Sequence, residues 1–364
     1  MSTTTDGRRV RLTVHPGLGK TATTTIQSVL RDSPGLWYGG IRSHPYDHPF
    51  ATAFEALLRE PIDRLTWRAR VPLPERIDLL ADAIATGLRD TPSGVGILSN
   101  EGILAHVGDD VGWRGPSVAR SGGGPGWRVA LERLERLGAV LERTAERLAD
   151  DGIALDVGGL LTIRRQGSLL ASSWAWNHEH YRRIGIRDEQ DLRRLVSADA
   201  FPRLRFSRII TAMEQAGVGP VTVLPLEALQ HEPGRFWTAL SDLVGATLSP
   251  RGAPPTANRR RTEGASWTVR TVANPVRARI GTAATFDRAV AALPVPVRAR
   301  LEHLLRARSA DGARLTVSRT FLADVDAAYA DDLRMIAPAC PFDLAGLGYA
   351  TPSDPTPEGG RTVP

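Results

Sequence analysis

The sequence predicts an α/β protein with a mostly parallel central sheet flanked by helices. Short segments rich in β-branched residues alternate with longer segments of helical periodicity, a pattern typical of βαβ units. The first short segment is followed by a glycine-containing loop and then by a helix. With 42% hydrophobic residues among 364, the chain can bury a sizeable core, either as one large domain or as two smaller ones.

Strands are expected where short apolar segments stop at glycine, proline or polar residues. Residues 9–15 read RVRLTVH and are broken by Pro16-Gly17. Residues 94–99 (GVGILS) are typical of a buried strand,. Further strands are expected at residues 36–39, 158–164 and 221–224,.

Helices are expected where apolar residues recur every three or four positions. The first begins near Lys20 and carries Ile26, Val29 and Leu30 on one side,. Similar patterns predict helices at about 50–59, 75–88, 127–148, 168–182, 203–215 and 234–244. The chain beyond about residue 261 is expected to be helical, most clearly at 294–308 and 319–336.

The domain organisation follows from composition. Residues 107–127 are rich in glycine and lack periodicity, so we expect a flexible connection there,. We interpret residues 1–350 as a single domain whose helical C-terminal portion starts at about 262. Residues 351–364 are rich in Pro, Gly and Thr and are predicted to be a disordered tail,.

The sequence predicts a soluble cytoplasmic protein. Cys340 is the one cysteine, so no internal disulfide can form and nothing suggests secretion,. Residues 1–9 are polar, and the apolar run at 10–14 is too short for a signal peptide,. No segment approaches the roughly 20 consecutive apolar residues of a membrane-spanning helix, so we expect no transmembrane segment.

The charge suggests anionic ligands. The net charge is +6, and the basic residues are spread along the chain, which suits anions without requiring nucleic acid. Zinc-finger spacing, aromatic RNA-binding signatures and basic heptad helices are missing, so nucleic acid is not an expected partner. Among 46 Lys and Arg residues there is a single lysine, Lys20. Either it survives by chance or its position requires a compact point charge.

The turn at His15–Gln27 (HPGLGKTATTTIQ) is typical of a phosphate-binding loop. Glycines let backbone N–H groups approach an anion, the helix N-terminus has a positive dipole end, and threonine hydroxyls add donors. A Walker A loop would need its first glycine at Val14,. A dinucleotide fingerprint is formally met by Gly17, Gly19 and Ala22, but no acid ends the second predicted strand,.

Residues Lys20–Thr24 (KTATT) resemble the K-T-G-T-T loop of sulfotransferases that use 3′-phosphoadenosine 5′-phosphosulfate (PAPS). In that family the loop grips the 5′-phosphosulfate, and the resemblance extends to Gln27. It implies that the donor is bound by Gly19, Lys20, Thr21, Ala22, Thr23 and Thr24. It also implies that Lys20 contacts the bridging oxygen of the leaving phosphate. Ala22 replaces the family's glycine, so a left-handed backbone there stays open; a polar helix start capped by threonines is the alternative reading.

A second match concerns the 3′-phosphate that distinguishes PAPS from common adenine nucleotides. The family uses an arginine that ends a central strand and a serine eight residues later on the next helix. Arg164 and Ser172 have that spacing, and an arginine fork can bond two phosphate oxygens. Arg165 and Ser173 could replace them if the register is off by one. A surface arginine and a helix-facing serine are the alternative interpretation.

Two later segments also resemble the family. Residues 221–245 are similar to its late strand, its Y-E-x-L segment and a helix ending in glycine. Glu227 matches the acid, whereas Leu226 replaces the tyrosine. Asn258 and Arg259 resemble a segment that returns to the nucleotide. Four partial matches in family order, from residue 12 to about 261, imply a P-loop NTPase-like sulfotransferase fold.

The resemblance implies transfer of a sulfuryl group from PAPS to a hydroxyl or amine, which leaves adenosine 3′,5′-bisphosphate. The acceptor could be a carbohydrate, a lipid headgroup or a small natural product. No metal is implied, because such transfer asks the protein mainly to align oxygens and to absorb charge. His178 and His180 are two positions apart on a predicted helix and face different ways,.

Two residues are candidates for the base that takes the acceptor proton. His48 follows the second predicted strand, where several relatives carry a catalytic histidine,. Glu101, in the segment LSNEG, matches the family's S-S-E segment, and it could instead cap a helix or orient a neighbour. We prefer His48, with His44 as a nearby alternative.

Two other functions compete with the sulfotransferase. An ATP- or GTP-dependent P-loop kinase needs a complete Walker loop, a magnesium-binding acid and preferably a hydroxyl directly after the lysine. Of these three requirements, the sequence clearly meets only the last, with Thr21. A non-catalytic nucleotide-binding protein is also compatible with the altered loop glycine.

Overall fold

The computed structural model describes residues 8–40, 54, 57, 72–104, 125–176, 178–183, 185–248, 250, 266–268, 297 and 314–350. Its centre is a five-stranded sheet with the order β2-β3-β1-β4-β5, in which all neighbours run parallel. The strands are β1 (Arg9–His15), β2 (Trp37–Gly40), β3 (Val95–Ser99), β4 (Ala154–Ile163) and β5 (Val221–Pro225). The predicted α/β class with a parallel sheet is therefore confirmed.

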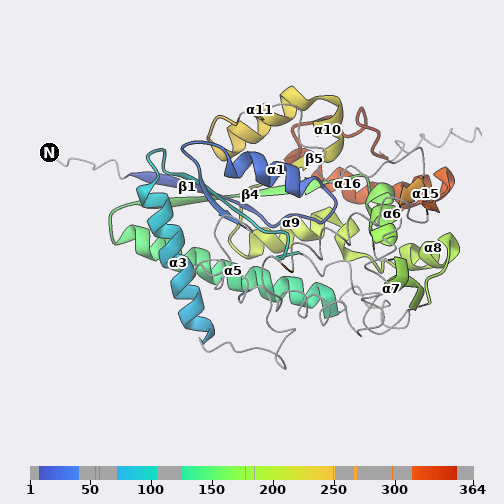
Figure 1. The fold of residues 1–364 in the computed structure, drawn as a ribbon, viewed down its shortest axis with the longest axis horizontal. Coiled ribbons are helices and arrows are strands. Elements are labelled where there is room, and N and C mark those ends of the chain that lie inside the picture. The colour runs from blue at the N-terminus through green and yellow to red at the C-terminus, as the bar shows by residue number, and fades with distance from the viewer. Residues whose placement is uncertain are drawn as a thin grey trace, which may run out of the picture.

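Helices cover both faces of this sheet (Figure 1). One face carries α1 (Thr23–Arg31), α10 (Leu226–His231) and α11 (Pro233–Val244). The other carries α3 (Leu73–Asp90), α5 (Pro125–Ala149) and α9 (Phe206–Gln215). Toward the carboxyl ends of the strands lie α6 (Gln166–Trp176), α7 (His178–Arg183) and α8 (Glu189–Ser197).

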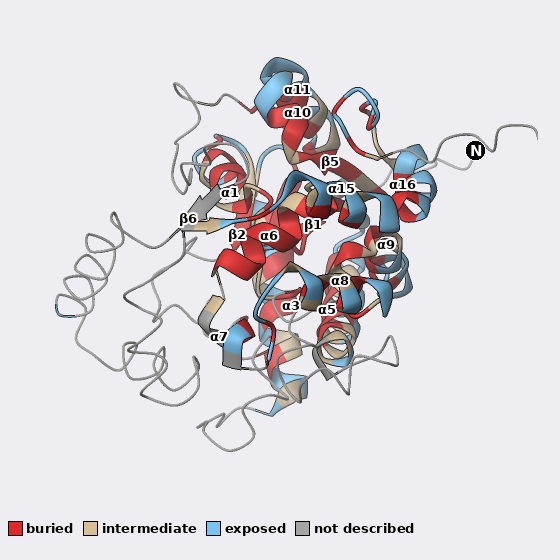
Figure 2. Ribbon diagram, turned by 90° about the vertical axis from the view of Figure 1, so that its right-hand side faces the viewer, coloured by how far each residue is buried: buried red, intermediate tan, exposed pale blue. Residues whose placement is uncertain are grey.

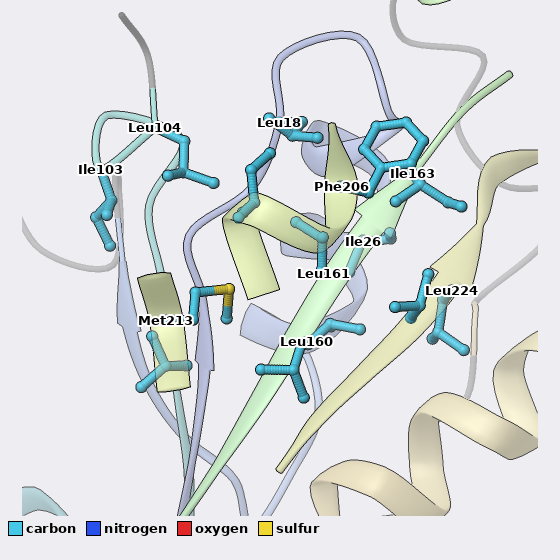
Figure 3. Packing of buried hydrophobic residues seen from close by; sticks show 14 of the residues in the cluster. Leu18, Ile26, Ile103, Leu104, Leu160, Leu161, Ile163, Phe206, Met213 and Leu224 are labelled. Atoms are coloured by element: carbon cyan, nitrogen blue, oxygen red, sulfur yellow. The ribbon is translucent and has the colours of Figure 1, made fainter. Parts of the chain in front are cut away.

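The central strand β1 is buried on both sides, because β3 and β4 flank it and helices cover both faces,. Figure 2 shows that buried residues concentrate in the sheet and in α6. Leu18, in the loop after β1, belongs to the same hydrophobic core as Ile26 of α1 and Leu160 of β4 (Figure 3). Polar side chains also lie in this interior, among them Thr13 and His15.

Most predicted elements are present, with shifted ends. The strand at residues 9–15 has the predicted bounds, whereas β4 begins at Ala154 instead of 158. Helix α1 starts at Thr23 and not near Lys20, because Lys20 and Ala22 have left-handed backbones with φ of 76° and 62°,. The helix predicted at 168–182 is divided into α6 and α7, and neither α8 nor α10 was predicted.

The C-terminal part contains α15 (Arg319–Ala328), α16 (Ala330–Ile336) and a short 3₁₀ turn at Ala337–Ala339. The prediction of a purely helical portion is wrong in one respect. Strands β6 (Ser266–Thr268) and β7 (Arg314–Thr316) pair antiparallel. Three residues are too few to reveal the two-residue alternation of a strand,.

Several predictions fall on residues outside the described ranges. They include most of the helices at 50–59 and 294–308, most of the connection at 107–127, and the tail at 351–364. The single domain over 1–350 likewise stays a prediction.

Two carboxylates, the half-buried Asp326 and the buried Asp332, attach the C-terminal helices to the rest of the fold. Asp326 of α15 accepts a hydrogen bond from the backbone N–H of Gly167, at 2.7 Å. A Cβ at Gly167 would lie 2.5 Å from the Leu322 carbonyl oxygen, so glycine permits α6 and α15 to touch there. Asp332 of α16 accepts from the N–H of Phe206 at 2.7 Å and so caps α9,.

Among the described helices, none combines the length with the apolar character that crossing a membrane would require.

Candidate anion-binding site at the carboxyl ends of the strands

The connections between the strands diverge beside β1. The chain leaves β1 toward β2 at one edge of the sheet and leaves β4 toward β5 at the other edge. In open parallel sheets, ligands bind where the connections diverge in this way, outside the carboxyl ends of the strands. The loop at 16–22 follows β1, and Arg164 directly follows β4. The predicted donor-binding segments therefore follow adjacent strands at the same edge.

The loop after β1 has an unusual backbone. Gly17, Lys20 and Ala22 have φ values of 60°, 76° and 62°. Ala22 is thus left-handed although it is not glycine, which answers the question that the sequence left open. Left-handed residues that alternate with other conformations make successive N–H groups converge on a common concavity. The loop consequently has the geometry of an anion cradle.

The donors of this cradle are not used elsewhere in the described part of the chain. The backbone N–H groups of Thr21, Ala22, Thr23 and Thr24 donate no hydrogen bond there, and α1 has no side-chain cap. These groups coincide with the N-terminus of α1, where the helix dipole favours negative charge. An anion is the ligand that would satisfy them.

Lys20 extends from the loop after β1 to α6. Its ammonium nitrogen lies 3.3 Å from the centroid of the Trp176 ring. Ser172 and Ser173 precede Trp176 by one helical turn and therefore lie on the same side of α6,. Both serines are buried. The contact thus brings the lysine to the helix that carries the predicted serine.

The two arginines after β4 have different surroundings. The N–H of Arg165 donates to Glu227 Oε1 at 3.2 Å, and its Nε lies 3.7 Å from the same oxygen. Arg164 forms no ion pair with a described residue. Burial lowers the pKa of Arg164, against the opposing effect of the Glu227 charge. Arg164 is thus a half-buried cation that would gain from an anion, and the geometry favours it over Arg165 as a phosphate ligand.

Glu227 connects this strand end to the C-terminal segment. Its carboxylate is buried, and Tyr349 donates to Oε2 at 2.6 Å. The family resemblance pointed to Glu227, but the sequence did not reveal its partners, because Tyr349 lies 122 positions away.

Glu101 lies beside the loop. Thr23 Oγ1 donates to its Oε1, and a Cβ on Gly17 would lie 3.3 Å from its Cγ. The structure thus brings one predicted catalytic residue next to the predicted donor loop, in the role of a carboxylate that orients a neighbour. His48, His44, Asn258 and Arg259 lie outside the described residues.

Sequence reasoning missed a buried polar cluster beneath the loop. His15 Nδ1 lies 2.8 Å from Ser99 Oγ, and Nε2 lies 3.2 Å from Thr162 Oγ1. Thr162 also contacts Thr21, at 2.8 Å between the hydroxyl oxygens. Burial lowers the pKa of His15 to about 4, so the imidazole is neutral,. The sequence feature that could have revealed this cluster is a polar residue at or near the end of each of three buried strands.

Fold and site together define a parallel α/β protein with an open N–H cradle between its central strand and the following helix. Comparisons with protein-family models, with curated proteins and with solved structures find no match for this chain. A more particular assignment therefore depends on the residues described above.

Proposed function

We propose that the protein is a sulfotransferase with the P-loop NTPase-like sulfotransferase fold, and that it moves a sulfuryl group from PAPS to a hydroxyl or amine. The observation that carries the proposal is the pair of cationic sites after β1 and β4. The N–H cradle with Lys20 is one, and the guanidinium of Arg164, which forms no ion pair with a described residue, is the other. PAPS has two separate anionic groups, so a ligand of this kind matches two cationic sites that follow adjacent strands at the same edge of the sheet.

In this proposal the cradle binds the 5′-phosphosulfate. The acceptor oxygen or nitrogen forms a bond to sulfur while the bond between sulfur and the bridging oxygen breaks, and adenosine 3′,5′-bisphosphate leaves. Charge grows on the bridging oxygen, and the Lys20 ammonium neutralises it. Loss of such a donor costs roughly 3 kcal/mol of barrier stabilisation.

The 3′-phosphate is assigned to Arg164 with Ser172. Arg165 is the weaker candidate, because its backbone N–H donates to Glu227 and its guanidinium already forms an ion pair with that carboxylate, at 3.7 Å. A fork-shaped guanidinium at a half-buried position suits a phosphate, since it can donate two parallel hydrogen bonds. Asn258 and Arg259 complete the nucleotide site in this proposal, as the family resemblance implies.

We assign the role of the base that takes the acceptor proton to His48. Glu101 is the second candidate for this role, and His44 is the next. The hydrogen bond from Thr23 to Glu101 supports an orienting role for that carboxylate. Proton transfer to a positioned histidine typically contributes 10²- to 10⁴-fold to the rate. The acceptor class stays as wide as carbohydrate, lipid headgroup or small natural product. The proposal also includes a cytoplasmic location and no requirement for a metal.

One observation favours this function over an ATP- or GTP-dependent kinase. In a Walker loop, the hydroxyl after the lysine binds Mg²⁺. The corresponding Thr21 is fully buried, and its hydroxyl donates to the Leu18 carbonyl at 2.6 Å. This hydroxyl points into the protein interior and away from a bound nucleotide. A non-catalytic nucleotide-binding protein could have the same site, so only a measurement of turnover distinguishes it from a sulfotransferase.

Calorimetry distinguishes the candidates. Adenosine 3′,5′-bisphosphate should bind to the wild type and more weakly to Lys20→Ala, whereas ATP with Mg²⁺ should bind weakly to both. Tighter binding of ATP with Mg²⁺ would reject the sulfotransferase in favour of the kinase. Labelled PAPS with a panel of phenols, sugars and amines then tests turnover, and Lys20→Arg should restore little of it because a planar fork cannot replace a point charge.

A further inference from the structure

Five side chains form a continuous hydrogen-bond chain beneath the anion-binding loop. They come from α1, β3, β1, β4 and the loop itself: Gln27, Ser99, His15, Thr162 and Thr21. The chain ends on the backbone carbonyl of Leu18, a buried residue of the loop. It therefore ties the loop to the carboxyl ends of three adjacent central strands.

The hydrogen atoms of this chain can be assigned from one end. Thr21 has a single hydroxyl hydrogen and donates it to the Leu18 carbonyl, at 2.6 Å,. In the 2.8 Å contact between Thr21 and Thr162, Thr162 must then be the donor. Its only hydrogen is used in that bond, so Thr162 accepts from His15. The Nε2 atom of His15 therefore carries the proton.

At the Gln27 end of the hydrogen-bond chain, the donors point in the same direction. A neutral imidazole with its proton on Nε2 has an unprotonated Nδ1, which accepts from the Ser99 hydroxyl at 2.8 Å,. Ser99 in turn accepts from the side-chain amide of Gln27, at 3.1 Å. Every donor from Gln27 to Thr21 thus points toward Leu18. Hydrogen bonds that point one way along a chain strengthen one another.

We propose that His15 is a positioning residue whose Nε2–H tautomer sets the direction of this chain and thereby holds the anion-binding loop in shape. Because the chain fixes the Leu18 carbonyl to a buried hydroxyl, that acceptor cannot turn toward an incoming anion. The convergent N–H groups of residues 21–24 are left to face it. The effect on donor binding rests on the proposed function, whereas the effect on the loop does not.

The fold offers a matched control for the test. Thr13 is also fully buried and precedes His15 on the same strand, but its Oγ1 bonds to none of the residues that the structure describes. Threonine-to-valine changes keep the shape and remove the hydroxyl. Thr162→Val breaks the chain, Thr162→Ser keeps it, and Thr13→Val removes a hydroxyl that plays no part in it.

The first experiment uses the protein without ligand. Long-range ¹H–¹⁵N spectra of wild type should show His15 in the Nε2–H tautomer. Amide exchange over residues 16–22 should be about tenfold faster in Thr162→Val. In this variant, local opening of the loop no longer requires the side-chain hydrogen bonds to break. Thr162→Ser and Thr13→Val should exchange like wild type. An Nδ1–H tautomer in wild type, or equal exchange in Thr162→Val and Thr13→Val, overturns the inference.

If Thr162→Val fails to fold, the wild-type tautomer and Ser99→Ala decide the matter. Ser99→Ala removes the donor to Nδ1 but leaves Thr162, which can only accept from Nε2, so the Nε2–H tautomer should persist; a switch to the Nδ1–H tautomer in that variant contradicts the proposal. Adenosine 3′,5′-bisphosphate provides the functional readout. Thr162→Val should weaken its binding about tenfold and Thr162→Ser by less than about threefold. If wild type does not bind this nucleotide, the proposed function fails, and the tautomer and exchange data still test the chain.

Discussion

The ammonium nitrogen of Lys20 stands 3.3 Å above the ring of Trp176. The contact joins the loop after β1 to the last residue of α6. A cation over an indole ring gains about 0.5 to 2 kcal/mol, depending on how far it is removed from water. Trp176 therefore holds the lysine near the position where the proposed donor binds.

Because Lys20 is the only lysine, reductive methylation with ¹³C-formaldehyde labels one side chain, together with the α-amine. The indole ring should shield these methyl groups and move their NMR signal upfield. Trp176→Leu should return the signal to the position of free dimethyl-lysine, and adenosine 3′,5′-bisphosphate should shift it in wild type. A signal that Trp176→Leu leaves in place would mean that the two side chains do not meet in solution.

The adjacent arginines provide a second prediction. Arg164→Ala should weaken adenosine 3′,5′-bisphosphate by more than tenfold, since a charge-assisted hydrogen bond contributes roughly 1.5 to 3 kcal/mol. Adenosine 5′-monophosphate should be nearly unaffected. Arg165→Ala should change the affinity less and lower the thermal midpoint, because the buried Glu227 loses a cationic neighbour. Calorimetry and thermal unfolding measure both effects, and a larger affinity loss in Arg165→Ala would exchange the two roles.

The third prediction concerns acid stability. Burial lowers the pKa of His15 in the folded state to about 4, below the ordinary histidine value of about 6.5,, so the unfolded chain binds the proton first as pH falls. The corresponding stability is complete above about pH 6.5 and is lost progressively down to about pH 4, by roughly 3 kcal/mol in total. Urea unfolding of wild type and His15→Asn at pH 7 and 4.5 should show a smaller difference between the proteins at the lower pH. If His15→Asn does not fold, an NMR titration replaces it, and ring signals that titrate near pH 6.5 would contradict the prediction.

The fourth prediction concerns Ala22. A left-handed backbone costs a non-glycine residue roughly 1 to 2 kcal/mol, and Ala22 has φ of 62°. Ala22→Gly removes this strain but adds about 0.4 to 1 kcal/mol of unfolded-state freedom. The unfolding free energy should therefore rise by up to about 1 kcal/mol in urea titrations, whereas Ala22→Val should lower it. A clear loss of stability in Ala22→Gly would show that the loop is not left-handed at this residue.

The sequence was sufficient where local pattern decides structure. Strand β1 has the predicted bounds because a buried run of β-branched residues ends at Pro16. The start of α1 was misplaced, since the left-handed Ala22 reflects the loop as a whole and not the helix propensity of alanine,. Arg164 was found from its spacing to Ser172. Which of the two adjacent arginines bonds Glu227, by contrast, depends on the backbone placement of Arg165, which no sequence pattern encodes.

The hydrogen-bond chain shows the same limit. Along the sequence, His15 is 84 positions from its partner Ser99 and 147 positions from its partner Thr162. Each alone is an ordinary polar residue near the end of a strand. Only the strand order, with β1 between β3 and β4, brings them into contact.

Glu227 shares its carboxylate between two parts of the chain: Oε1 holds the N–H of Arg165, and Oε2 holds the hydroxyl of Tyr349. The segment after α16 is thereby coupled to the strand end that carries Arg164. Coupling between two equilibria is reciprocal, so a ligand that steadies this strand end tightens the attachment of the segment by the same free energy. Limited proteolysis near Tyr349 should accordingly slow when adenosine 3′,5′-bisphosphate is bound, and the C-terminal segment would report occupancy of the proposed nucleotide site.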